Sequence, residues 1–291
     1  MDINLWKTLF DDKFDYDQYL YHYTTVEKAI KIINSNELWF SRISKTNDTT
    51  ESKLRIKFKD SVTGKNILPD ERTKAVSEYL SSTSDCVRII CFSVDSKLNN
   101  EDLKDAEEMH LNHAKDKYFD ISGRGFALPR MWAQYASNHE GVCFIVNKRI
   151  FDEQLSQLAY CESRKVKYNS FFSSYTIYEQ ELQHLYNRCI QFANGMLSFI
   201  DLINSNSSFM NYNYFEKQRD WENEKEYRYV TLVDTARSNF DVKIGNLFGY
   251  VEGIVIGEKI DIAFENVMRL LVKDKCCVKK IHFGTNMCYV E

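Results

Sequence analysis

Hydrophobic residues in this chain gather mainly in short runs of strand length. Cys86 to Ser93 is an apolar run of the kind that forms a buried strand. Glu224 to Val233 alternates between polar and apolar positions, with the period of two that a strand requires. Further strands are predicted at 20–23, at 38–40, from Gly141 onward, at 253–256 and at 280–283.

Other segments carry apolar residues at helical spacing. Residues 26–33 form one such helix, which Thr24 or Thr25 can cap, and Pro129 suits the first turn of a short helix. The pattern also predicts two charged helices within 50–82, an exposed helix at 99–118, a long helix at 171–202 and a helix at 260–272. Because strands and helices are interspersed, the pattern predicts an α+β fold.

Composition favours one compact domain over residues 1–291. The chain has only 10 glycines and 2 prolines, which leaves little material for a flexible linker. The balance of 38 basic against 42 acidic residues excludes a strongly basic coat for nucleic acid, although a local basic groove remains compatible. The N-terminal residues lack a signal-peptide pattern and no apolar stretch has transmembrane length, so we expect a cytoplasmic protein without a membrane partner.

The eight cysteines have no Cys-x-x-Cys spacing, and most lie in apolar runs. This usage is typical of buried free thiols in a reducing compartment. We therefore expect no disulfide and no bound metal.

A charged row begins the strand predicted at 224–233. Glu224, Glu226 and Arg228 would share one strand face, and paired carboxylates there could stabilise a cationic, oxocarbenium-like centre. A solvated face with cross-strand ion pairs explains the same spacing, and for an isolated Glu-x-Glu it is the better explanation.

Three other segments carry candidate chemistry. His22 lies in an aromatic strand, where a core histidine is the ordinary outcome, but beside a pocket it could bond a ligand hydroxyl while Tyr23 offers a stacking face. Ser93 ends a strand with a hydroxyl group. Trp132 and Tyr135 share a helix face, which core packing also explains. No phosphate-binding loop or dinucleotide fingerprint is present.

The order of these motifs resembles a bacterial domain-of-unknown-function family, number 2971, over roughly residues 20 to 260. The motifs in order are Tyr21-His22-Tyr23-Thr24, Leu38-Trp39-Phe40-Ser41, Asn47-Asp48-x-x-Glu51, Cys91-Phe92-Ser93, Trp132-x-x-Tyr135-Ala136, Gly141-Val142-Cys143 and Trp221-x-x-Glu224-x-Glu226-x-Arg228. The chain departs from the family pattern by helical insertions at about 95–128 and 170–205.

That layout is in turn similar to the ADP-ribosyltransferase superfamily, whose fold is a split, mainly antiparallel β core that binds NAD in a cleft. The resemblance implies that His22 binds the nicotinamide ribose or amide and that Ser93 is the middle-strand hydroxyl. It makes Glu226 the catalytic carboxylate and Glu224 the residue that orients the acceptor. Tyr23 or Tyr135 would stack on the nicotinamide, and Thr24 and Arg228 complete the cofactor-binding set.

The resemblance implies an NAD-dependent ADP-ribosyltransferase that needs no metal and releases nicotinamide. Such enzymes are often toxins of bacterial defence or toxin–antitoxin systems, so an antitoxin or immunity protein is an expected partner. RNA is slightly favoured over protein as acceptor. The alternatives are an NAD-cleaving hydrolase and a non-catalytic nucleotide-binding or sensor module. The aromatic and basic residues between Tyr212 and Arg219 would suit stacking on unpaired bases, but packing of a core edge is favoured for them.

Two structural expectations follow. His22, Ser93 and Glu226 should meet at one cleft, with Trp132 and Tyr135 beside or beneath it. A Glu226→Gln exchange should lower turnover by roughly 10²–10³-fold or more with almost no change in melting temperature, because a cleft carboxylate is not a core support.

Overall fold

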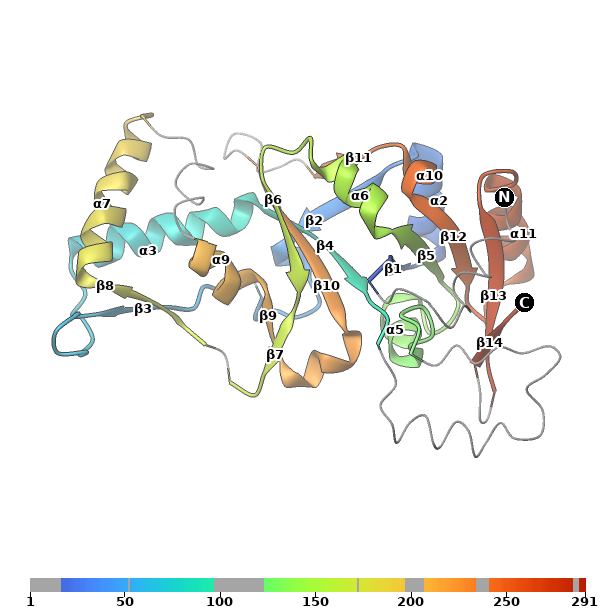
Figure 1. The fold of residues 1–291 in the computed structure, drawn as a ribbon, viewed down its shortest axis with the longest axis horizontal. Helices are drawn as coiled ribbons and strands as arrows, with labels where there is room; N and C mark the ends of the chain where they lie inside the picture. The colour runs from blue at the N-terminus through green and yellow to red at the C-terminus, as the bar shows by residue number, and fades with distance from the viewer. Residues whose placement is uncertain are drawn as a thin grey trace.

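The computed structural model describes residues 17–51, 53–96, 123–171, 173–196, 207–233, 241–284 and 288–291 (Figure 1). Its architecture is α+β, as the pattern predicts: a mixed, mostly antiparallel sheet crosses the middle of the molecule. The helices α3 (Glu71–Thr83) and α7 (Glu179–Ala193) lie at one end of the molecule. At the other end, α11 (Ile262–Leu271) lies with β13 (Cys277–Phe283) and β14 (Cys288–Val290). Within the described residues, no helix has the length and apolar character needed to span a bilayer.

The large sheet has the order β11-β2-β4-β1-β5-β12-β13-β14, with β10 paired to β4 and β6 paired to β10. Its strands are β1 (Tyr19–Thr24), β2 (Leu38–Arg42), β4 (Val87–Ser93), β5 (Val142–Asn147), β6 (Cys161–Lys165), β10 (Glu226–Leu232), β11 (Val242–Ile244), β12 (Val251–Ile256), β13 (Cys277–Phe283) and β14 (Cys288–Val290). Within this sheet only β12 and β13 pair in parallel among the described strands. Two small parallel sheets join β3 (Ile56–Lys59) to β8 (Tyr175–Tyr178) and β7 (Lys167–Asn169) to β9 (Glu216–Gln218).

The helices have ends that the sequence specifies. In α2 (Val26–Ser35), Thr25 caps the first turn by accepting from the Lys28 N–H at 3.3 Å, and Asn36 ends the helix in the left-handed conformation. The other α-helices are α3 (Glu71–Thr83), α5 (Pro129–Tyr135), α6 (Lys148–Leu155), α7 (Glu179–Ala193), α9 (Ser207–Tyr214), α10 (Leu247–Tyr250) and α11 (Ile262–Leu271). Short 3₁₀ helices are η1 (Ile43–Lys45), η2 (Ser84–Cys86) and η3 (Arg219–Glu224).

The sheet splits along one edge of β4. On the other edge β10 pairs with β4 along its whole length, from Glu226 opposite Ser93 to Leu232 opposite Val87. On the splitting edge β2 pairs only with the start of β4, through Ser41 and Arg42, while β1 pairs only with its last residue, Ser93. The strands β1 and β2 therefore diverge over the middle of β4, and this opening positions the site described below.

Side-chain alternation along β1 serves two different sides of the sheet. Tyr19, Tyr21 and Tyr23 pack in one apolar cluster with Trp132 of α5, while Leu20 packs on the opposite side against α2, α6 and β5. Trp132 is fully buried, and its ring meets Tyr23 edge-on with centroids 5.3 Å apart. A third cluster is built by α3, α7, α9 and the start of β4.

The pattern misassigned two regions. Residues 50–82 hold one helix, α3, rather than two, because residues 56–59 form β3 and pair with β8. The helix expected at 171–202 begins only at Glu179, because Tyr175–Tyr178 is that partner strand, and it ends at Ala193. The helix expected at 99–118 lies outside the described residues. The other predicted strands, and the helices at 26–33, from Pro129 and at 260–272, are confirmed within a few residues.

Candidate functional site

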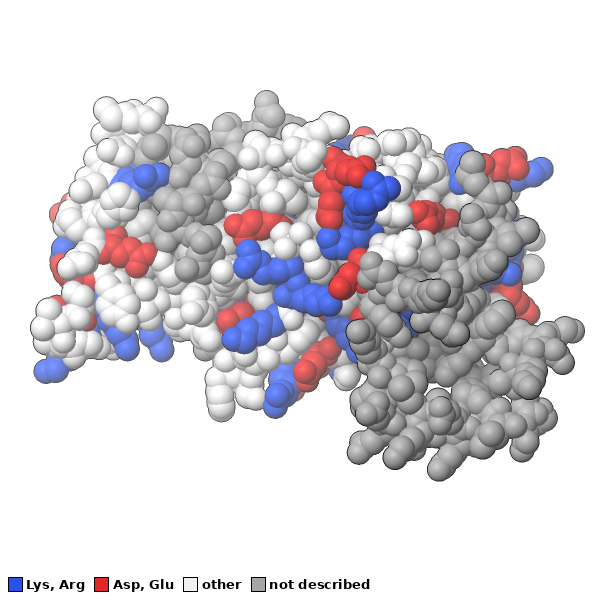
Figure 2. Space-filling model, in the orientation of Figure 1, with Lys and Arg blue, Asp and Glu red and all other residues white. Residues whose placement is uncertain are grey.

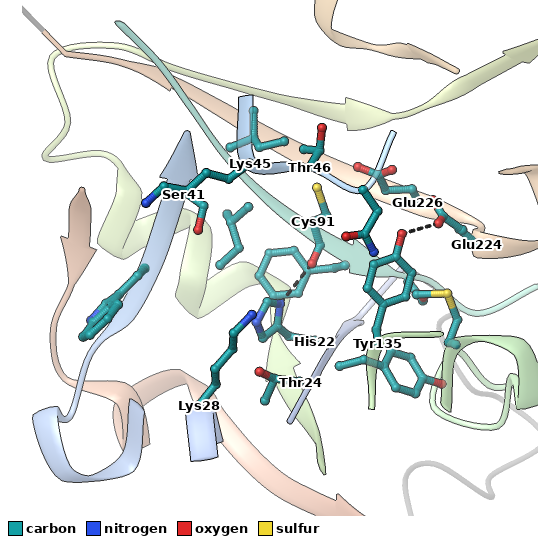
Figure 3. Close-up of a pocket in the computed structure, with 18 of the residues that line it drawn as sticks. His22, Thr24, Lys28, Ser41, Lys45, Thr46, Cys91, Tyr135, Glu224 and Glu226 are labelled. Carbon is teal, nitrogen blue, oxygen red and sulfur yellow. Dashed lines mark hydrogen bonds between the residues drawn. The ribbon is translucent and has the colours of Figure 1, made fainter. Parts of the chain in front are cut away.

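A cavity of about 540 Å³ lies where β1 and β2 diverge over β4. Its walls come from β1, α2, β2, η1, β4, α5 and η3, together with Glu51, Lys217 and Glu226 (Figure 3). Of the eight residues that the sequence singles out, seven border it: His22, Tyr23, Thr24, Ser93, Tyr135, Glu224 and Glu226. The eighth, Arg228, lies behind the carboxylates and is fully buried. The expected convergence of His22, Ser93 and Glu226 on one cleft is therefore observed.

His22 bridges the opening between the strands. Its Nδ1 lies 3.0 Å from the carbonyl oxygen of Cys91 in β4. Because a carbonyl only accepts, Nδ1 carries the proton, and Nε2 of the neutral ring keeps its lone pair. Burial lowers the pKa of His22, and the nearby Lys28 charge lowers it further. The ring is therefore neutral at neutral pH and offers Nε2 as a hydrogen-bond acceptor.

Glu226 is held ionised by two cations. Arg228 Nε donates to Oε1 at 2.5 Å, Arg228 Nη2 donates to Oε2 at 3.0 Å, and Lys217 Nζ lies 2.9 Å from Oε2. Burial alone would raise the pKa of Glu226, but the charges of Arg228 and Lys217 outweigh it and lower the pKa to about 2. Both oxygens of this carboxylate are thus engaged.

The alternating pattern predicts Glu224 on the strand, but in the structure Glu224 is the last residue of η3. Lys225 follows it in the left-handed conformation (φ 48°), and β10 begins only at Glu226. Nonetheless the two carboxylates meet, because Lys217 Nζ donates to Glu224 Oε2 at 2.7 Å. The Tyr135 hydroxyl donates to the other oxygen at 2.5 Å, as Figure 3 shows. Burial raises the pKa of Glu224, so it is the more basic of the pair.

A third carboxylate, Glu51, joins this group. Its Oε1 accepts from Arg228 Nη2 and lies 3.6 Å from Lys217 Nζ. We call these five buried side chains the ionic cluster: Glu51, Lys217, Glu224, Glu226 and Arg228. Three carboxylates face two cations, so the cluster carries a formal charge of −1 beside the cavity.

The opposite side of the cavity is basic. Lys28 and Lys31 of α2, Arg42 of β2 and Lys45 of η1 border it. In Figure 3, Lys28 lies at the lower left, and the side chain of Lys45 runs leftward from beside Thr46, away from Glu224 and Glu226. Neither of these two lysines forms an ion pair within the residues that the structure describes, so both are available to an anionic ligand.

Two of the expected site residues, Tyr23 and Arg228, form structural contacts. The Tyr23 hydroxyl donates to the Gly125 carbonyl at 2.7 Å and its ring packs in the core, so Tyr135 is left as the aromatic group facing the carboxylates. Arg228 acts as a counter-ion rather than lining the cavity. Tyr214 and Phe215 are buried, which confirms core packing over base stacking for that segment.

Sequence reasoning missed two members of the ionic cluster. Glu51 ends the Asn47-Asp48-x-x-Glu51 motif, and that motif is the signal that could have found it. Lys217 had no such signal, since it is one of 38 lysines and arginines and reaches the site only through the pairing of β9 with β7. The eight cysteines are free, and the described residues contain no group of three potential metal ligands.

A comparison with models of protein families gives a match to part of this chain. Searches of curated proteins and of solved structures return nothing similar. The family model covers the part of the site formed by Tyr135, Glu224 and Glu226, and it does not extend to His22 or Ser93. Residues 131–229, about a third of the chain, match a family described as protein of unknown function (DUF2971).

Proposed function

We propose that this protein is an NAD-dependent ADP-ribosyltransferase whose active site is the cavity at the split of the sheet. One observation carries the proposal: His22, Ser93 and Glu226, far apart in sequence, border a single cavity between diverging strands. A split antiparallel core with a histidine, a hydroxyl and a glutamate on successive strands is the arrangement that the superfamily resemblance implies.

The charges around the cavity support a ligand with two unlike ends. The basic side, with Lys28 and Lys45, suits the diphosphate of NAD, and the acidic side suits the ribose that becomes cationic. A neutral His22 with a free Nε2 acceptor suits a ribose hydroxyl donor. A cavity of about 540 Å³ falls within the usual range for small-molecule sites, roughly 300–1,000 Å³.

The proposed reaction breaks the bond between the ribose C1″ and the nicotinamide nitrogen. The bonding pair leaves with nicotinamide, which becomes neutral, and C1″ becomes part of an oxocarbenium-like centre. The ionic cluster, with a formal charge of −1, stabilises that centre more than the ground state. An acceptor oxygen or nitrogen then supplies an electron pair to C1″ and loses its proton, for which Glu224 is the more basic carboxylate.

The acceptor is proposed to be a nucleic acid, with RNA ahead of protein, and the biological role that of a bacterial toxin or phage-defence effector with an antitoxin or immunity partner. Figure 2 shows lysine and arginine side chains in a band over the strands β6 and β10, interspersed with acidic ones. Arg164 and Lys165 of β6 contribute side chains that are 40% and 59% exposed. An anionic acceptor is compatible with such a band.

The test is incubation of the purified protein with NAD labelled in its adenylate part, together with RNA, DNA or protein extract. We expect the label on RNA and an equal amount of released nicotinamide. Free ADP-ribose without a labelled macromolecule would instead establish an NAD-cleaving hydrolase. Binding of NAD without nicotinamide release would leave a non-catalytic nucleotide-binding module, and absence of binding would refute the whole proposal.

A further inference from the structure

We infer that Glu51 binds the ligand directly, by accepting a hydrogen bond from a ribose hydroxyl through its Oε2 atom. This inference rests on the proposed function, because it assigns a ribose to the same cavity. It gives a role to the Asn47-Asp48-x-x-Glu51 motif, which the catalytic assignment leaves unused.

Glu51 borders the cavity and is only 3% exposed. Its Oε1 is taken by Arg228 and lies near Lys217, whereas its Oε2 is buried and has no hydrogen-bond partner within the described part of the chain. A buried carboxylate oxygen without a donor destabilises the fold, because it loses its hydrogen bonds to water and forms none within the protein. A donor supplied by a bound ligand satisfies it.

The position of Glu51 relative to Glu226 indicates which part of the ligand supplies that donor. The same nitrogen, Arg228 Nη2, donates to both carboxylates, so their head groups are neighbours. Glu226 has both oxygens engaged by Arg228 and Lys217, and Glu51 retains one that is not. The hydroxyl of Ser93 is also buried without a partner among the described residues. Two unsatisfied polar atoms at the carboxylate end suit the two adjacent hydroxyls of one ribose.

The local structure of the motif explains how Glu51 is presented. Asp48 Oδ1 accepts from both the N–H and the hydroxyl of Thr50, at 2.8 and 2.6 Å. The Glu51 N–H donates to the Asp48 carbonyl at 3.2 Å, which closes a turn. This turn lies in the loop that leaves β2 and η1, and so the motif places a carboxylate in the loop after the strand that forms one wall of the split.

The experiment compares ADP-ribose with two analogues that lack either the 2″ or the 3″ hydroxyl, with affinity measured by titration calorimetry. ADP-ribose has no nicotinamide bond to break, so binding is read without turnover. The proteins are the wild type, Glu51→Gln, Glu51→Asp and the control Glu222→Gln, whose side chain is 60% exposed in η3. Glu51→Gln keeps the size and leaves two carboxylates against two cations, and Glu51→Asp keeps the charge but withdraws the oxygen.

In the wild type and the control, loss of one of the two hydroxyls should weaken binding by about 10- to 100-fold, as for a hydrogen bond to a charged group. In both Glu51 variants, removal of the same hydroxyl should weaken binding by less than about 3-fold. A purely structural Glu51 would weaken all three ligands alike and leave their ratios unchanged, which would overturn the inference while the proposed function stands. If the wild type does not bind ADP-ribose at all, both fail.

Discussion

Glu226→Gln is the substitution that most directly separates the two roles of the ionic cluster. The exchange keeps the shape of the side chain and removes its charge. Glu226 is 4% exposed, and it bonds Arg228 through two nitrogens and Lys217 through a third. The sequence alone led to the expectation of an almost unchanged melting temperature. The structure reverses that expectation, because the carboxylate supports two buried cations.

The size of the loss can be worked out in two ways. A fall in the pKa of Glu226 from 4.5 to about 2 corresponds to about 3 kcal/mol of stabilisation at neutral pH, because each pKa unit is worth about 1.4 kcal/mol. Removal of one partner from a buried ion pair costs about 3–5 kcal/mol. The variant keeps two carboxylates against two cations, so we expect the lower end, about 3 kcal/mol.

Urea unfolding as a function of pH measures this effect. The pKa of Glu226 is lower in the folded protein than in the unfolded chain, so its stabilisation is complete above pH 4.5 and disappears as the pH falls toward about 2. The difference between wild type and variant should therefore be about 3 kcal/mol at pH 7 and shrink steadily in acid. On the proposed function, NAD turnover measured where both proteins are folded should fall by about 10²–10³-fold.

Glu222→Gln is the matched control, since that side chain is exposed and lies 3.8 Å from Arg219 at the surface. It should change the free energy of unfolding by less than about 0.5 kcal/mol. Equal stability of Glu226→Gln and wild type at pH 7, or a difference that does not change with pH, would refute the ionic cluster as described. Full turnover in the variant would end the catalytic assignment of Glu226.

Three further outcomes follow from buried positions. Lys217→Met should lower the free energy of unfolding by about 3–5 kcal/mol in urea titrations, since three carboxylates then face one guanidinium, and Lys217→Arg should lose less than half of that. Gly257→Ala should cost at least about 1–3 kcal/mol, because an added Cβ would lie 2.0 Å from the carbonyl oxygen of His139, whereas Gly245→Ala meets no atom within 4 Å and should cost less. Burial raises the pKa of Asp95 to about 6, so ionisation of Asp95 between pH 4 and pH 7 should lower the free energy of unfolding by about 3 kcal/mol. Urea unfolding of Asp95→Asn over the same pH range should show no such loss.

Elements with strong local signals could be predicted from the sequence. The helix α2 was predictable because its apolar spacing and its cap at Thr25 indicate the same helix. The strand β4 was predictable because it is an apolar run of strand length that ends at the hydroxyl of Ser93. The strand β3 and its partner β8 were not, because each is four residues long and the two are over a hundred residues apart. Their pairing is a tertiary interaction that local periodicity does not report.

The site was predictable only where a motif carried it. The pair Glu226 and Arg228 could be placed on one strand face, and the structure joins them by two hydrogen bonds. Glu224 could not be placed, because the left-handed Lys225 interrupts the alternation and no local pattern requires that conformation. Lys217 could not be recognised as a member of the site, since its partners Glu51, Glu224 and Glu226 come from two segments far apart in the sequence.

The position of the ionic cluster relative to the cavity is what connects stability to chemistry. Well-packed apolar residues of similar volume are often as stabilising as a buried ion pair, so folding alone gives no reason for five charged groups in one wall. On the proposed function they have another role. The positive charge of bound NAD starts on the nicotinamide ring and moves to the ribose as the bond breaks. A negative wall at the ribose therefore stabilises the transition state more than bound NAD, and the cations behind it keep those carboxylates ionised and in place.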